Sequence, residues 1–179
     1  MKNTLINSGL AAFVLIVIFL IMNAINPKLN FAFTINLVIS SVVYLFFLIR
    51  AGFHNRKNKG GYLGFGEAFI NALSIYALVS FLFSIFFFIM LNINPELMKI
   101  AETSYLEMME SGMRMTGLSE EQIALQMEQQ GTLDMEKALS WSSSIMGWFG
   151  SLIFPGMIYV LITTFITKKK APEETKEEV

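Results

Sequence analysis

Uncharged, mostly apolar stretches alternate with short charged segments along this 179-residue chain. A helix needs roughly 20 predominantly apolar residues to cross the hydrocarbon core of a bilayer. Four stretches without a charged residue exceed that length, at positions 3–27, 29–49, 68–95 and 138–167. The pattern therefore predicts an all-α membrane protein with four transmembrane helices, over about residues 5–25, 31–49, 68–91 and 140–167.

Asparagine–proline pairs end the first and third predicted spans, at Asn26-Pro27 and Asn94-Pro95. Proline disfavours helical geometry in the residue before it, so each pair gives its helix a clean end. The turn after the first pair is very short, and the four spans are therefore expected as two hairpins. Because residues 19–29 and 87–97 are identical at seven of eleven positions, the second hairpin is either a duplication of the first or a coincidence of apolar composition.

The segment between the third and fourth spans predicts a small helical subdomain. Asn94 can cap a helix that runs to about Ser111, with Gly112 ending it. Ser119 and Gln122 have the spacing of a capping box at the start of a second helix. Short helices must bury an apolar face against the protein or a partner. The residues expected on that face are Leu97, Ile100, Met108, Ile123 and Met127.

Basic residues fall mainly on one side of the predicted membrane. Nine of the 13 Lys and Arg residues lie before the first span, between spans two and three, or after span four, and cytoplasmic loops are enriched in these residues. Both termini are therefore expected in the cytoplasm. The subdomain at 95–137 carries nine acidic and three basic residues and is expected on the outer side. Residues 1–170 form one membrane domain, and 171–179 is expected to be a disordered cytoplasmic tail.

Residues suited to catalysis are scarce. The chain has no cysteine, its single histidine is His54 in a basic loop, and no Asp or Glu lies inside a predicted span. Ser151 in the fourth span therefore has no histidine to activate it as a nucleophile. The composition indicates a protein that is not an enzyme, with no cofactor and no nucleic-acid partner.

Neutral polar residues within the spans support an alternative function, that of a channel or a small-solute permease component. Such residues more often hydrogen-bond between helices. The candidates for a pore lining are Asn36, Ser40, Tyr44, Asn71, Ser74, Tyr76 and Ser80.

Two further patterns each have a structural and a functional interpretation. Thioether sulfurs are soft ligands that suit Cu(I), but methionine also fills apolar interfaces; this group is Met108, Met109, Met113 and Met115. Small residues at four-residue spacing let another helix approach closely, in this chain or in a homodimer; this group is Ser143, Gly147, Ser151 and Pro155. Pro155 is also expected to kink its helix, because the carbonyl four residues earlier loses its usual donor.

Three short motifs resemble domain-of-unknown-function family 4199. They are GGYLGFGEAF at 60–69, INPE at 93–96 and LSEEQ at 118–122. The resemblance implies a bacterial four-helix protein of the inner membrane, and it brings no known activity. The leading interpretation is an uncharacterised multi-pass scaffold or interaction protein, embedded in the lipid bilayer, whose acidic outer subdomain holds a membrane or periplasmic protein. The channel ranks second and an intramembrane enzyme third.

Overall fold

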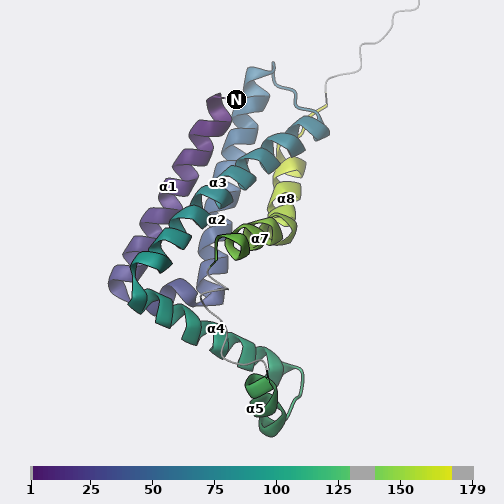
Figure 1. The fold of residues 1–179 in the computed structure, drawn as a ribbon. Coiled ribbons are helices and arrows are strands. Elements are labelled where there is room, and N and C mark those ends of the chain that lie inside the picture. The colour runs from purple at the N-terminus through teal and green to yellow at the C-terminus, as the bar shows by residue number, and fades with distance from the viewer. Residues whose placement is uncertain (1, 130–139, 171–179) are drawn as a thin grey trace, which may run out of the picture.

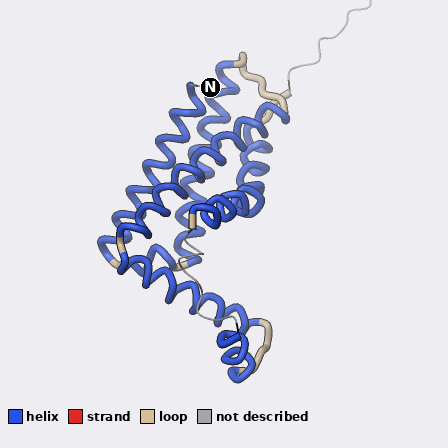
Figure 2. Tube along the Cα trace, viewed as in Figure 1, coloured by secondary structure: helices blue, strands red, loops and turns tan. Residues whose placement is uncertain are grey.

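The chain forms four long apolar helices and a projecting helical arm (Figure 1). The computed structural model describes residues 2–129 and 140–170, and nearly all of this part is helical (Figure 2). The four helices, of 22 to 29 residues, are long and apolar enough to cross a membrane, which confirms the predicted all-α class with four candidate spans. The expected tail at 171–179 lies outside the described residues. The first three candidate spans are Thr4–Ile25 within α1 (Lys2–Ile25), α2 (Phe33–Asn58) and α3 (Phe65–Ile93). The fourth, Trp141–Thr167, comprises three segments: α7 (Trp141–Ser151), the π-helical η2 (Leu152–Gly156) and α8 (Met157–Thr167).

The second helix differs from the prediction of about 31–49 at both ends. It starts later because residues Pro27–Phe31 form a separate 3-10 helix, η1. It continues through the basic segment to Asn58, since Lys and Arg are good helix formers and a charged segment does not by itself end a helix. The helix ends before Gly60 and Gly61, whose φ angles of 73° and 93° lie in the left-handed region that glycine adopts without a steric penalty.

Each asparagine–proline pair ends one helix, as predicted, and also begins the next; the start at Asn94 was predicted, whereas η1 after Asn26 was not. The Oδ1 atom of Asn26 accepts the backbone N–H of Lys28 at 3.0 Å at the start of η1. The Oδ1 atom of Asn94 accepts the backbone N–H groups of Glu96 and Leu97 at 3.2 and 3.1 Å. The two caps lie at the same end of the bundle (Figure 1), where η1 packs on the helix that Asn94 begins. This end is called the arm end below.

The arm consists of α4 (Pro95–Met115) and α5 (Glu120–Gln129) and projects away from the bundle (Figure 1). The predicted end at Gly112 is wrong, because α4 continues through this residue; a helical glycine costs only about 1 kcal/mol relative to alanine. The turn is made by Gly117, with φ 83°. The predicted capping box is confirmed, since Ser119 N–H donates to Gln122 Oε1 at 3.0 Å and Gln122 N–H donates to Ser119 Oγ at 3.3 Å.

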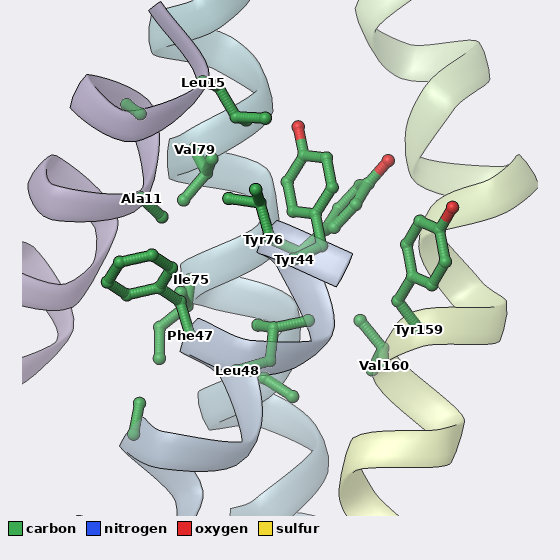
Figure 3. Close-up of a cluster of buried hydrophobic side chains, with 14 residues drawn as sticks. Ala11, Leu15, Tyr44, Phe47, Leu48, Ile75, Tyr76, Val79, Tyr159 and Val160 are labelled. Atoms are coloured by element: carbon green, nitrogen blue, oxygen red, sulfur yellow. The ribbon is translucent and has the colours of Figure 1, made fainter. Parts of the chain in front are cut away.

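A buried cluster joins the four spans at the centre of the bundle (Figure 3). Helices α2 and α3 contact each other, and both α1 and α8 pack on this pair. Small residues such as Ala51 and Ala72 are buried in the cluster, which allows close approach of the helices. Gly52 lies in close contact with α8, since a Cβ atom there would lie 2.5 Å from Cγ2 of Thr167.

A second cluster at the arm end ties α4 to the spans. The Phe19 ring makes edge contacts with Phe83, Phe86 and Phe87 at centroid distances of 6.3, 5.4 and 5.7 Å. Leu97, in the first turn of α4, is buried in the same cluster. The base of the arm is therefore fixed by the same apolar contacts that hold α1 on α3.

The opposite end of the bundle is closed by polar contacts. The backbones of Leu63 and Lys169 exchange two hydrogen bonds of 2.9 and 2.8 Å, which join the start of α3 to the end of α8. An ion pair joins Lys59 to Glu67. These contacts hold the basic segment and the last lysines together at one end.

Candidate functional site

The fourth candidate span is broken in the middle. Phe154 has non-helical backbone angles (φ −141°, ψ 124°), and the chain changes direction between α7 and α8 (Figure 1). The kink predicted at Pro155 is therefore present. Helix α8 packs on both α2 and α3, whereas α7 packs on α3. The arm-end half of α2 keeps an exposed apolar surface that includes Phe33, Val38 and Val42.

A cavity of about 440 Å³ lies in the arm-end half of the bundle, bounded by α1, α2, α3 and the break. This volume falls within the range of sites for small organic molecules, roughly 300–1,000 Å³. None of the described residues that line it is charged. The lining combines apolar and neutral polar side chains, chiefly Leu15, Phe19, Asn30, Asn36, Ser40, Tyr44, Tyr76, Phe83, Phe87, Met108 and Pro155.

One wall of the cavity is polar because Asn36, Ser40 and Tyr44 follow each other at four-residue spacing on α2, and such residues share a helix face. The Asn36 Nδ2 group donates to the carbonyl oxygen of Asn30 at 2.7 Å and to that of Leu29 at 3.2 Å. Ser40 Oγ donates to the carbonyl oxygen of Leu37 at 3.3 Å. The Tyr44 hydroxyl has no hydrogen-bond partner among the residues that the structure describes, although this side chain is only 8% exposed.

Asn30, in η1, is the most unusual group in the lining. It is 8% exposed, and neither its Oδ1 nor its Nδ2 atom has a hydrogen-bond partner within the described chain. A buried amide without partners costs of the order of 1–3 kcal/mol, so such groups are rare unless a ligand or water serves them. Asn30 could not be recognised from the sequence, because an asparagine in a short turn has the pattern of an ordinary turn residue.

Three tyrosines meet in the central buried cluster (Figure 3), and two of them, Tyr44 and Tyr76, also line the cavity. The ring of Tyr44 lies 4.7 Å from that of Tyr76 and 5.8 Å from that of Tyr159, between centroids. The Tyr159 hydroxyl lies 2.6 Å from Ser41 Oγ, which links α8 to α2. Ser41 and Tyr159 could not be recognised from the sequence, because a contact across 118 residues leaves no local pattern.

The Tyr76 hydroxyl compensates for the break in the fourth span. It donates at 3.0 Å to the carbonyl oxygen of Ser151, the group that loses its helical donor because Pro155 has no N–H. Gly156 lies against the same ring, where an added Cβ atom would be 2.4 Å from Tyr76 Cε1. Ser151 Oγ donates to the carbonyl of Trp148 at 2.7 Å, so this serine serves its own helix.

The predicted pore residues are divided between two cavities and the core. Asn36, Ser40, Tyr44 and Tyr76 line the cavity described above. Asn71 and Ser74 line a second cavity of about 510 Å³ at the opposite end of the bundle, with Thr4, Leu5, Glu67, Ile70 and Leu78. Ser80 is buried and accepts a hydrogen bond from Trp148 Nε1 at 3.0 Å. Among the described residues, the predicted pore residues therefore belong to two separate cavities and to the buried core between them, and they do not line one continuous pore.

The predicted apolar face of the arm is only partly covered. Leu97 and Ile123 are buried, and Ile100 is half-buried. Met108 is exposed and lines the mouth of the cavity. The side chain of Met127 lies outside the described residues. Apolar side chains that remain exposed on the arm are Tyr105, Met115 and Leu125.

The four methionines proposed as soft metal ligands lie on different faces of α4. Successive residues of an α-helix point about 100° apart. The side chains of the neighbours Met108 and Met109 therefore point in different directions, and those of Met113 and Met115, two positions apart, lie on nearly opposite sides of the helix. Met108 and Met115 are exposed. In the described residues, no group of three or more His, Cys, Asp or Glu side chains is arranged to hold a metal ion. The expectation for these methionines, an apolar packing or partner face rather than a copper site, stays a prediction.

The small residues of α7 do not make the closest helix contacts. A Cβ atom added at Gly147 would meet nothing within 4 Å, whereas one added at Gly156 would overlap Tyr76. Ser143 N–H donates to Ser140 Oγ at 3.2 Å at the start of the helix. For Ser143, Gly147, Ser151 and Pro155, helix packing within the chain and its alternative, contact with a second copy of the chain, both stay predictions.

Residues 7–169 match the family model described as "Protein of unknown function (DUF4199)". Because this match covers most of the chain, the protein belongs to that family, as its motifs indicated. No curated protein and no solved structure matches the chain.

Proposed function

We propose that this member of the family is a non-enzymatic scaffold of the bacterial cytoplasmic membrane, whose arm holds a protein partner on the outer side. In this proposal both termini are cytoplasmic, and α4 and α5 form an extracytoplasmic subdomain. The four spans form two hairpins, in which Asn26 and Asn94 have equivalent roles as caps.

The distribution of basic residues supports this orientation. Arg56, Lys57 and Lys59 lie at one end of the bundle with Lys168 and Lys169. Such clusters are typical of the cytoplasmic side. The arm leaves the bundle at the opposite end (Figure 1), and its residues 95–129 contain seven acidic and two basic residues, a net charge of −5.

The single observation that carries the partner proposal is an apolar face that continues beyond its covered part. Positions 97, 101, 105, 108 and 115 lie within one side of α4, since the helix repeats every 3.6 residues. Leu97 is buried against the spans, but Tyr105 and Met108 are exposed, and Met115 is 87% exposed. The other side of α4 carries Glu96, Glu107 and Glu110. A partner that fits has an apolar patch bordered by basic residues.

Photo-crosslinking in intact cells tests this proposal. A benzophenone amino acid at Tyr105 or Met115 should give a discrete adduct with a second protein, because both side chains are exposed on the arm. The same group at Phe13, an exposed apolar residue of α1, serves as the control for a lipid-facing position. Identical adducts from Phe13, or no protein adduct from either arm position, would contradict the proposal. An adduct of twice the chain mass would show that the arm contacts a second copy of this chain and not a different protein, and the proposal would become a homodimer.

A channel or permease component is the second candidate, and the two cavities favour it. They lie at opposite ends of the bundle, and both have neutral polar residues in their walls. Transport would need the core around Ala72 and Ile75 to open, since both residues are buried. Solute uptake into proteoliposomes, compared with empty liposomes, tests this candidate.

A further inference from the structure

The arm-end cavity combines a hydrocarbon-like wall with unpartnered hydrogen-bonding groups. Leu15 and Phe19 from α1, with Phe83 and Phe87 from α3, provide the apolar side. The polar side contains Asn30 and Tyr44, each more than nine-tenths buried. Neither the Oδ1 nor the Nδ2 atom of the Asn30 amide has a hydrogen-bond partner among the described residues, and the amide offers both a donor and an acceptor.

The absence of charge among the described lining residues restricts the ligand. A phosphate or an ammonium group inside this cavity would lack a counter-charge, and burying an unpaired charge is strongly unfavourable. An ester carbonyl is a neutral acceptor that suits the N–H groups of Asn30 and the O–H of Tyr44. The part of the ligand inside the cavity is therefore uncharged.

The dimensions suit an acyl chain from one leaflet. Asn36 and Tyr44 are eight residues apart on α2, which corresponds to roughly 12 Å along the helix. This is a little less than half of the hydrocarbon thickness of about 30 Å. Asn30 lies in η1, where the chain turns between two candidate spans, so the edge of the hydrocarbon core, where glycerol esters begin, is expected near it. Lys28, also in η1, is exposed beside this turn and can meet a phosphate that stays outside.

From these observations we infer that the cavity is a binding site for the acyl-ester part of a glycerolipid. The chain lies against Leu15, Phe19 and Phe87, and an ester carbonyl accepts a hydrogen bond from the Asn30 amide. The inference is independent of the protein partner proposed for the arm, although Met108 of α4 lies at the mouth of the same cavity.

The test uses the full chain, purified in detergent, and a diacylglycerol with a photoreactive diazirine in one acyl chain. Labelling should map to residues 15–22 and 83–87 and should saturate. Dioleoylglycerol and dioleoyl-phosphatidylglycerol serve as competitors, and whichever competes at lower concentration identifies the source of the ester. Hexadecane has no ester, and equal competition by hexadecane would show a merely apolar void and overturn the inference.

Variants separate recognition from folding. Asn30→Leu keeps a similar side-chain volume and should weaken labelling roughly two- to tenfold, as expected for the loss of one neutral hydrogen bond. Its thermal stability without lipid should not fall, because the substitution removes an amide that has no partner. Tyr44→Phe is the second variant and should act in the same direction. Asn92→Leu is the matched control, since Asn92 is exposed and bonds to Phe88 of its own helix. Equal labelling of Asn30→Leu, Tyr44→Phe and Asn92→Leu would overturn the inference.

Discussion

Removing the hydroxyl of Tyr76 should destabilise the bundle, because one backbone carbonyl group, that of Ser151, loses a hydrogen-bond donor. In the Tyr76→Phe variant the ring keeps its place against Tyr44 and Gly156, but the carbonyl of Ser151 loses its donor at 3.0 Å. Pro155 cannot replace that donor. Backbone carbonyl groups within a membrane need hydrogen-bond partners. The variant should therefore destabilise the break between α7 and α8, where the Ser151 carbonyl lies.

The expected magnitude lies between two limits. Interhelical hydrogen bonds in membrane proteins average about 0.6 kcal/mol and reach about 1.7 kcal/mol. A buried acceptor left unpaired costs about 1–3 kcal/mol. We expect Tyr76→Phe to lower the free energy of unfolding by about 1–2 kcal/mol. Tyr44→Phe should change it by less than about 0.5 kcal/mol, because the Tyr44 hydroxyl has no partner among the described residues.

Equilibrium unfolding of the purified protein in mixed detergent micelles measures both variants. A double-mutant cycle with Pro155→Ala adds a sharper test, since alanine restores an N–H that can serve the Ser151 carbonyl. The effect of Tyr76→Phe should then shrink by about 0.5 kcal/mol or more. Equal effects of Tyr76→Phe and Tyr44→Phe, or strict additivity with Pro155→Ala, would refute the role assigned to this hydrogen bond.

Two further substitutions test the packing of the bundle and of the arm. Gly52→Ala should destabilise the protein by about 1–3 kcal/mol, because its Cβ would lie 2.5 Å from the Thr167 side chain. Gly147→Ala, which meets nothing within 4 Å, should not destabilise the protein in the same unfolding assay and should stabilise it by up to about 1 kcal/mol, because alanine is the better helix former. Ile123→Asp should open the arm to limited proteolysis and abolish crosslinking from it, since the side chain is only 5% exposed and an unpaired buried charge is costly. Glu120→Ala should change neither, since its ion pair with Arg114, at 3.4 Å, is exposed and worth less than about 1 kcal/mol.

The spans and the helix caps could be predicted because both follow from local chemistry. A charged residue inside the hydrocarbon core is costly, so uncharged gaps mark the four helices directly. The helix end at Asn26 and the cap at Asn94 were recognisable because a cap and the backbone N–H groups that donate to it lie within three residues. The capping box of Ser119 and Gln122 could be predicted for the same reason.

The arrangement around the cavity could not be predicted, because it depends on contacts between distant residues. The sequence predicts a kink at Pro155, but the donor that completes it, Tyr76, lies 75 residues from Ser151. Asn30 is notable only because the fold buries it without a partner. The extension of α4 through Gly112 has a different cause: one unfavourable residue does not end a helix whose first turn is anchored in the core.

Cysteine accessibility tests the central claim of four spans with an outer arm most directly. The natural chain has no cysteine, so single substitutions at exposed positions can be labelled without background. In intact cells with a permeabilised outer membrane, a membrane-impermeant maleimide should label Glu121→Cys on the arm. Lys57→Cys, in the basic segment, should react only after the cytoplasmic membrane is disrupted. Labelling of Lys57→Cys in intact cells, with Glu121→Cys protected, would contradict the account.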